Sequence, residues 1–206
     1  MDNHHLIINV GRQIGSGGRV IAQKLAQEFG AQFYDKEILE LAARESGFAP
    51  EFFEKNDEQK GFLRSLFNLH TPNMGSSSFY TSNFSQEGLF KLQSDAIRKA
   101  AQEGPCVFVG RCADYVLRDF PHAVNIFVTA PMDVRVTHVA ERHQCPPEEA
   151  RRMIEKGEAE RASYYNYYTG KRWGHADSYH LCVDASLLGV EATARYVGHF
   201  IKSYCK

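Results

Sequence analysis

A glycine-rich bend near the amino end constrains the fold of this chain more than any other feature. It reads Gly11-Arg12-Gln13-Ile14-Gly15-Ser16-Gly17-Gly18-Arg19 and lies between an apolar run at 6–10 and a segment at 20–29 whose apolar residues recur at helical spacing. Glycines permit positive φ and let backbone amides approach a ligand, and the first turn of a helix adds unpaired N–H groups and partial positive charge. The bend therefore favours a phosphate-binding loop between a buried strand and a helix.

The bend departs from both common phosphate-binding patterns. In G-x-x-x-x-G-K-[ST], Gly18 occupies the lysine position and Arg19 the hydroxyl position. In the dinucleotide pattern G-x-G-x-x-G, Val20 stands where the third glycine belongs. Taken alone, the bend is thus also compatible with a tight strand-to-helix turn that binds no ligand. The other motifs of the chain are needed to distinguish this turn from a phosphate-binding loop.

Strand-like and helical segments alternate along the rest of the chain. Short apolar runs at 31–34, 106–109, 123–128 and 179–184 predict strands, and helical spacing predicts helices at 36–45, 86–103, 132–142, 147–161 and 190–204. Five strands that alternate with helices are typical of a parallel sheet flanked by helices. The stretch 50–87 is turn-rich and aperiodic, as in a functional loop or a mobile subdomain.

Composition narrows the class of protein. A chain of 206 residues can form one domain with a sizeable core, and its net charge of −1 argues against a general binder of nucleic acid or anionic membranes. No apolar run is long enough to span a bilayer and the amino end lacks signal-peptide features, so we expect a cytoplasmic protein. The five cysteines include no C-x-x-C pair, and Cys106 and Cys182 are interpreted as core thiols.

Two charged residues directly follow predicted strands, where an open α/β sheet places its ligand contacts. Asp35 follows the run 31–34, and capping the next helix is its simpler role, although both roles can coexist. Arg111 follows the buried strand 106–109, where packing does not explain an arginine. Its planar guanidinium suits a phosphate or a carboxylate, and we favour that use over a surface charge.

The last third of the chain carries a tyrosine-rich, basic segment. The charged helix predicted at 147–161 runs into the segment 164–174, which is suited to closing over an anionic ligand. His138 and His143 have no partner at metal-ligand spacing, so we expect solvated or core histidines and predict no protein metal ligands.

Taken in order, these motifs resemble the cytidylate kinase-like family, a branch of the P-loop nucleoside monophosphate (NMP) kinases. They are the bend 11–19, Phe33-Tyr34-Asp35-Lys36-Glu37, Gly110-Arg111, and the segment 161–170 with Trp173. The resemblance covers essentially the whole chain. It implies a three-layer P-loop kinase fold: a core of residues 1–35, 104–144 and 175–206, a mobile NMP-binding insertion at about 36–103 and a helical lid at about 145–174.

The resemblance also implies an activity, which is transfer of the ATP γ-phosphoryl group to CMP or dCMP with the help of Mg²⁺. The partners implied are small nucleotides, not nucleic acid or membranes, and the protein is expected to be a monomer or a homodimer. The resemblance matches Gly15, Ser16, Gly17, Gly18 and Arg19 with the phosphate loop, Asp35 and Arg111 with acceptor contacts, and Arg161 with the lid arginine. We further expect ATP to contact Arg12 and Val20 and the acceptor to contact Lys171 and Arg172, and we expect Arg19, Arg111 and Arg161 to be catalytic.

The sequence departs from the family pattern at chemically important positions. Gly18 removes the loop lysine, Cys112 replaces the aspartate of a Gly-Arg-Asp motif, and the lid motif R-D-x-x-D-x-x-R keeps only its last arginine, at Arg161. In that motif Ile154 replaces the first arginine, and Glu155 and Glu158 replace the aspartates.

These departures bear on the chemistry because phosphoryl transfer relies on neutralising spreading negative charge. We expect the missing cation from Arg12, Arg19, Lys171 or Arg172. We expect Mg²⁺ to be held by substrate phosphates and water. Two alternatives stay open: a nucleotide-binding sensor that transfers no phosphate, and a kinase whose acceptor is not a nucleotide.

Overall fold

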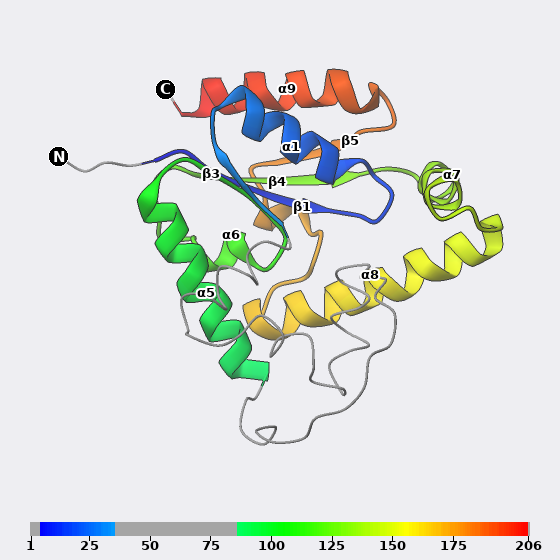
Figure 1. Cartoon of the computed structure of the whole chain (residues 1–206), viewed down its shortest axis with the longest axis horizontal. Coiled ribbons are helices and arrows are strands. Elements are labelled where there is room, and N and C mark those ends of the chain that lie inside the picture. Colours follow the sequence, from blue (N-terminus) through cyan, green and yellow to red (C-terminus); the bar gives the residue numbers. More distant parts are fainter. Residues whose placement is uncertain (1–4, 36–85, 206) are drawn as a thin grey trace, which may run out of the picture. The chain divides into compact units, whose positions relative to one another are not determined.

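A parallel sheet organises the computed structural model, which describes residues 5–35 and 86–205 (Figure 1). Its order is β2-β3-β1-β4-β5, and all four neighbouring pairs are parallel. The strands are β1 (Ile7–Arg12), β2 (Gln32–Tyr34), β3 (Cys106–Val109), β4 (Ala123–Thr129) and β5 (Leu181–Asp184). The predicted five-stranded parallel sheet is confirmed.

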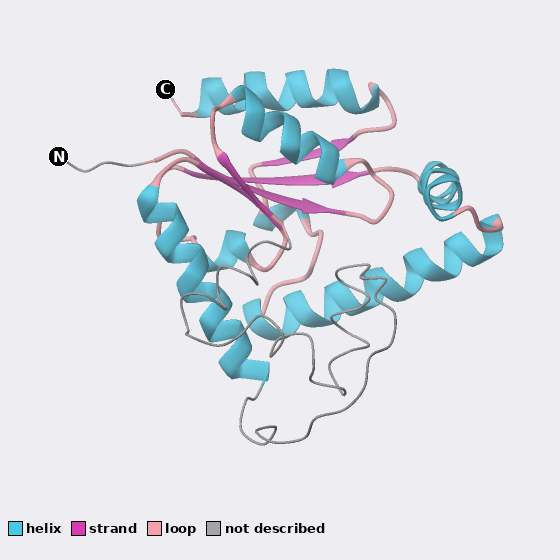
Figure 2. Ribbon diagram, in the orientation of Figure 1, coloured by secondary structure: helices cyan, strands magenta, loops and turns pink. Residues whose placement is uncertain are grey.

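Helices cover both faces of this sheet (Figure 2). The helices of the described residues are α1 (Gly18–Glu28), α5 (Gln86–Glu103), α6 (Ala113–Val116), α7 (Met132–His143), α8 (Pro147–Thr169), the short 3-10 helix η1 (Ala176–Ser178) and α9 (Gly189–Tyr204). Helices α1 and α9 lie side by side on one face, and α6 and α8 lie on the other side (Figure 1). Among the described residues, no helix is long and apolar enough to cross a membrane.

The chain divides into two compact units, and the first contains the whole sheet. It comprises Met1–Asp35 and Arg98–Lys206, and the second comprises Lys36–Ile97. The predicted helix at 36–45 and residues 50–85 of the predicted aperiodic stretch 50–87 lie outside the described residues. The boundaries predicted for the NMP-binding insertion and the lid therefore stay predictions.

Apolar residues of the strands fill the space between the sheet and the helices α1 and α9. Side chains of a strand alternate between the two faces of a sheet, and branched aliphatic residues pack well there. The cluster on this face includes Ile8, Val10, Val107, Val109, Val124, Ile126 and Val128 of the strands and Ile21, Leu25, Val197 and Ile201 of the helices. These side chains are buried, so this core holds the strands against α1 and α9.

Strand register brings three predicted site residues to one edge of the sheet. Val10 pairs with Val109, so Arg12 and Arg111 each lie two residues beyond that pair. Tyr34 pairs with Phe108, which places Asp35 near the same end of β3. Because parallel strands all present their carboxyl ends at one edge, positions that are distant in sequence become neighbours there.

The structure differs from the sequence-based predictions in three places. Helix α8 runs on to Thr169, eight residues past the predicted end, and stops at Gly170, which has φ of 66°. A short helix, α6, follows Arg111 and was not predicted. The prediction that Cys182 is a core thiol is wrong, because Cys182 is exposed on the edge strand β5, whereas Cys106 is buried as predicted.

A polar pair is embedded in the centre of the sheet. Asn9 of β1 lies opposite Asn125 of β4, and the Asn9 Nδ2 donates to Asn125 Oδ1 at 2.9 Å. The Asn9 side chain is 3% exposed, and its Oδ1 has no hydrogen-bond partner among the described residues. The fold therefore depends on Asn125 to satisfy a buried amide.

Asn125→Ala is expected to lower the free energy of unfolding by about 1–3 kcal/mol, because a buried donor loses its acceptor. Replacing both residues, as Asn9→Val with Asn125→Val, should recover most of that loss, since no buried polar group is left without a partner. Chemical denaturation of both variants measures the difference. Equal destabilisation of the single and the double variant would contradict the assignment.

Candidate active site

The bend between β1 and α1 is held in shape by short hydrogen bonds and close packing. Gly15 and Gly17 have φ of 81° and 82°, a conformation that side chains rarely adopt. Ser16 Oγ donates to Gln13 O at 2.9 Å, and His138 Nδ1 donates to Gly15 O at 2.8 Å. The loop therefore has a defined backbone path that ends at the first turn of α1.

The amides of the bend are only partly used by the protein. Gln13 N donates to Val128 O at 3.0 Å, and Ile14 N donates to Glu158 Oε1 at 3.1 Å. Within the part of the chain that the structure describes, the amides of Gly15, Gly17 and Arg19 donate to no protein acceptor. These three donors lie at the amino end of α1, where the helix also contributes partial positive charge.

Four arginines from four separate elements gather around Asp35. Arg19 Nε donates to Asp35 Oδ2 at 2.6 Å, and Arg12 Nη2 lies 3.6 Å from Asp35 Oδ1. Arg161 of α8 reaches the end of β1, where its Nη1 donates to Arg12 O at 3.2 Å. Arg111, in the turn after β3, interacts electrostatically with Arg12 and Asp35.

The electrostatics of this cluster favour a bound anion. Burial above all, together with the charge of Arg12, lowers the pKa of Arg161 to about 9 and that of Arg111 to about 10. Burial also lowers the pKa of Arg12, against the opposing effect of Asp35. Asp35 alone cannot balance four guanidinium groups, and Glu158, which acts on Arg161, is already paired with Arg135. An anion with several charges would therefore relieve their mutual repulsion.

An unusual backbone turn carries Arg111. Gly110, Arg111 and Cys112 have φ of 75°, 60° and 55°, so three consecutive residues are left-handed. Non-glycine residues in this region cost about 1–3 kcal/mol each and persist where the surrounding structure holds them. Here Cys112 and the following Ala113 are buried, so the packing of α6 fixes the strained turn. Strain of this kind accumulates at functional sites, which supports a role for Arg111.

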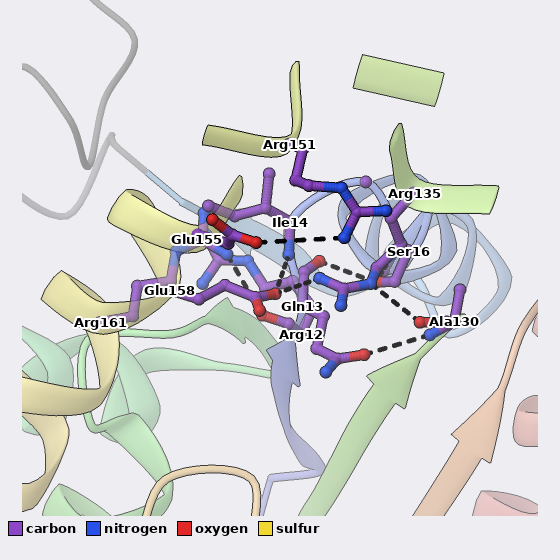
Figure 3. A network of polar contacts seen from close by, with 12 residues as sticks. Arg12, Gln13, Ile14, Ser16, Ala130, Arg135, Arg151, Glu155, Glu158 and Arg161 are labelled. Atoms are coloured by element: carbon purple, nitrogen blue, oxygen red, sulfur yellow. Dashed lines mark hydrogen bonds and ion pairs between the residues drawn. The ribbon is translucent and has the colours of Figure 1, made fainter. Parts of the chain in front are cut away.

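A second network, drawn in Figure 3, joins the bend to α7 and α8. Glu158 Oε1 accepts from Ile14 N and also from Arg135 Nη1, at 2.6 Å. Arg135 Nε in turn donates to Ala130 O at 2.8 Å, and its side chain is only 6% exposed. Arg135 was not singled out by the sequence analysis. Its helical spacing from Met132 and Val139 places it on the apolar face of α7, and a charged residue there could have indicated a buried ion pair.

The other predicted site residues lie apart from these contacts. Val20 is exposed on α1. Lys171 and Arg172 are exposed just after α8, and the charge of Lys171 acts on Asp114, lowering its pKa. Burial outweighs that effect and raises the pKa of Asp114, whose Oδ2 accepts from Tyr165 Oη at 2.6 Å. Contact of Lys171 and Arg172 with a substrate stays a prediction.

Metal binding by side chains has little support in this geometry. Residues 5–35 and 86–205 include no group of three or more histidine, cysteine, aspartate or glutamate side chains that could hold a metal ion. Asp35 and Glu158 are already paired with arginines, and Ser16 Oγ is bonded to Gln13 O. The residues present therefore fit an anion better than a directly bound cation.

Comparison with known proteins identifies the family. The family model described as the cytidylate kinase-like family matches residues 7–187. The chain belongs to the cytidylate kinase-like family. This cytidylate kinase-like chain is also 27% identical over 191 residues to a cytidylate kinase of Methanopyrus kandleri, with 88% of this chain and 85% of that protein covered.

Solved structures place the cytidylate kinase-like chain among the P-loop kinases by fold. An uncharacterized protein from Eubacterium ventriosum is 27% identical, with a TM-score of 0.73 over 97% of this chain and 99% of that one. Shikimate kinase from Bacteroides thetaiotaomicron has a TM-score of 0.55 at 12% identity, covering 96% of this chain and 98% of that one. The likeness to shikimate kinase is one of fold alone. The predicted P-loop kinase fold is confirmed.

Glu158→Ala is expected to lower the free energy of unfolding by about 3–5 kcal/mol, because the buried Arg135 loses its carboxylate. Glu155→Ala is the matched control on the same helix. Its 4.0 Å pair with Arg151 is exposed, so its loss should change stability by less than about 0.5 kcal/mol. Urea denaturation of both variants measures the contrast, and similar losses would show that the Glu158 pair does not anchor the loop.

Proposed function

We propose that this kinase-like protein transfers the γ-phosphoryl group of ATP to CMP, dCMP or a related phosphorylated small molecule. The observation that carries the proposal is the gathering of Arg12, Arg19, Arg111 and Arg161 around Asp35, beside unpaired amides of the bend. Such a site suits two phosphorylated ligands whose negative charges meet. The relatedness to a cytidylate kinase supports the choice of acceptor.

The residues would divide the work between the two ligands. The amides of Gly15, Gly17 and Arg19 would bind the ATP phosphates at the amino end of α1. Arg111, held by its strained turn, would bind the acceptor phosphate, with Asp35 near the acceptor nucleoside. Bidentate binding by a guanidinium orients a phosphate as well as attracting it, so these contacts would align the two reacting groups.

Catalysis would then depend on charge. Negative charge spreads over the transferring phosphoryl group and its flanking oxygens in the transition state. Arg19, Arg111 and Arg161 would neutralise that charge from different sides, since the cluster has more guanidinium groups than carboxylates. Mg²⁺, when bound with ATP, would neutralise further charge, held by phosphates and water because Asp35 and Glu158 are paired with arginines.

A second candidate function is a nucleotide sensor that transfers no phosphate. It is favoured by the glycine at position 18 and by Glu158, whose carboxylate occupies the Ile14 amide that a phosphate could otherwise use. The kinase and the sensor would both bind nucleotide, but only the kinase would release ADP. A kinase with a non-nucleotide acceptor is a third possibility, which the same assay distinguishes when such acceptors are included.

We expect ATP-dependent ADP release when the protein is given CMP or dCMP, measured by a coupled assay against a panel of other nucleoside monophosphates and of non-nucleotide acceptors. Nucleotide binding in a thermal-shift assay, with no ADP release for any acceptor, would favour the sensor. A non-nucleotide acceptor that outcompetes CMP would establish the changed specificity. Absence of nucleotide binding altogether would refute both candidates.

Arg111→Ala is expected to raise the KM for the acceptor by roughly 10- to 100-fold, because a charge-assisted contact contributes about 1.5–3 kcal/mol. ATP binding, measured separately by calorimetry, should survive. Arg118→Ala is the control, since Arg118 is exposed, lies just beyond α6 and stacks on Tyr115. An unchanged acceptor KM in Arg111→Ala would show that Arg111 does not bind the acceptor.

A further inference from the structure

The space above Gly18 is taken by Arg12. A Cβ added at Gly18 would lie 2.5 Å from Arg12 Cβ, 3.1 Å from Val128 Cβ and 3.2 Å from Arg12 Cγ. The two Cβ atoms are fixed by their backbones, so rotation of a side chain cannot move them away. Gly18 is the first residue of α1 and is buried, and its φ lies outside the left-handed region. Space, and not backbone conformation, therefore requires glycine where the standard loop has lysine.

The Arg12 side chain continues from Gly18 toward a second glycine. A Cβ at Gly110, in the turn after β3, would overlap Arg12 Nη1. Beyond it Arg12 Nη2 approaches Asp35 Oδ1, and the side chain as a whole is 17% exposed. Arg12 thus passes between glycines of two loops, and its guanidinium ends within the arginine cluster at the carboxyl edge of the sheet.

The other cations that the sequence offers as replacements for the loop lysine are more exposed than Arg12. The Arg19 side chain is 46% exposed and spans Asp35 and the ring of Phe33, 5.7 Å from its guanidinium carbon. Lys171 and Arg172 are exposed beyond the end of α8. The backbone of Arg12, by contrast, is anchored on both sides: Arg161 donates to its carbonyl, and the next amide, of Gln13, donates to Val128 O.

We infer that Arg12 supplies, from the end of β1, the positive charge that a standard phosphate-binding loop supplies from the first turn of its helix. Gly18 and Arg12 then depend on each other. Compared with a standard loop, the cation comes from β1 instead of α1, and the absence of a side chain at Gly18 leaves space for Arg12. The inference rests on the proposed function and assigns to Arg12 direct contact with the ATP phosphates. In the free protein Asp35 pairs with this guanidinium, and an incoming polyphosphate would compete with that pairing.

The packing of Arg12 over Gly18 can be tested without any ligand. Gly18→Ala should lower the denaturation midpoint strongly in the parent protein but much less when Arg12→Gly is also present, because that change removes the Cβ and Cγ that obstruct it. A double-mutant cycle isolates this coupling from the separate effect of each substitution. If Gly18→Ala lowers the midpoint equally in both backgrounds, Arg12 does not occupy the lysine space and the inference is wrong.

The role of Arg12 in binding is tested with ATP as the probe. Arg12→Ala should lose at least about tenfold in ATP affinity by calorimetry, with kcat also reduced, because a charge-assisted contact with the phosphates is lost. Arg12→Lys should keep part of both, and Arg12→Gly combined with Gly18→Lys should regain affinity over Arg12→Gly alone. Arg195→Ala, exposed on α9, is the control, and circular dichroism checks that each variant is folded.

The outcomes separate this inference from the proposed function. If the parent binds ATP and transfers phosphate while Arg12→Ala does both equally well, the inference is overturned and the proposed function stands. If the parent binds no ATP, the proposed function fails and the inference fails with it. Loss of affinity in Arg12→Ala, together with recovery through Gly18→Lys, supports the transfer of the cation from helix to strand.

Discussion

Mutual repulsion among Arg12, Arg19, Arg111 and Arg161 is the constraint around which the structure is organised. Like charges brought together in a partly buried site oppose folding unless other interactions hold them. The sheet supplies that hold, because its register sets Arg12 and Arg111 level with each other two residues past a buried valine pair. The hydrophobic core beneath this edge therefore stabilises a cluster of four arginines whose mutual repulsion opposes folding.

Two carboxylates near the cluster do different work. Asp35 lies among the guanidinium groups and pairs with Arg19 and Arg12. Glu158 is turned toward the loop and the buried Arg135, so it positions the backbone through which Arg12 enters the site. The first carboxylate lies where ligand charge is expected, and the second belongs to the scaffold. This separation explains how one site can hold a net positive charge and a defined loop together.

The sequence predicted most of the fold because its apolar residues recur at the periods of strands and helices. The place of Arg111 at the carboxyl edge of the sheet could be predicted because it follows a buried strand after one glycine. Its contact with a ligand stays a prediction. The relation of Arg12 to Gly18 could not be predicted, because motif comparison treats each position separately, whereas these two residues compete for the same space. The pair of Arg135 and Glu158 also escaped prediction, since its partners are 23 residues apart on two helices.

Errors in the predictions have similar causes. Cys182 was assigned to the core from its apolar neighbours, but the strand order, which the sequence does not reveal, places β5 at an edge. The end of α8 was predicted too early because tyrosines are weak helix formers, and tertiary contacts such as that of Tyr165 with Asp114 override the weak propensity.

One continuous helix, α8, carries both Glu158 and Arg161, and only three residues separate it from α7. Each residue of an α-helix turns the next by about 100°, so the angular relation between the two side chains is set by the helix itself. The backbone positions of Glu158, which accepts from the loop, and of Arg161, which donates to Arg12 O, are therefore rigidly linked. The number of residues in α8 before Glu158 therefore determines the direction in which both side chains leave the helix. Insertions or deletions there would turn Glu158 and Arg161 away from the loop, whereas substitutions would leave their directions unchanged.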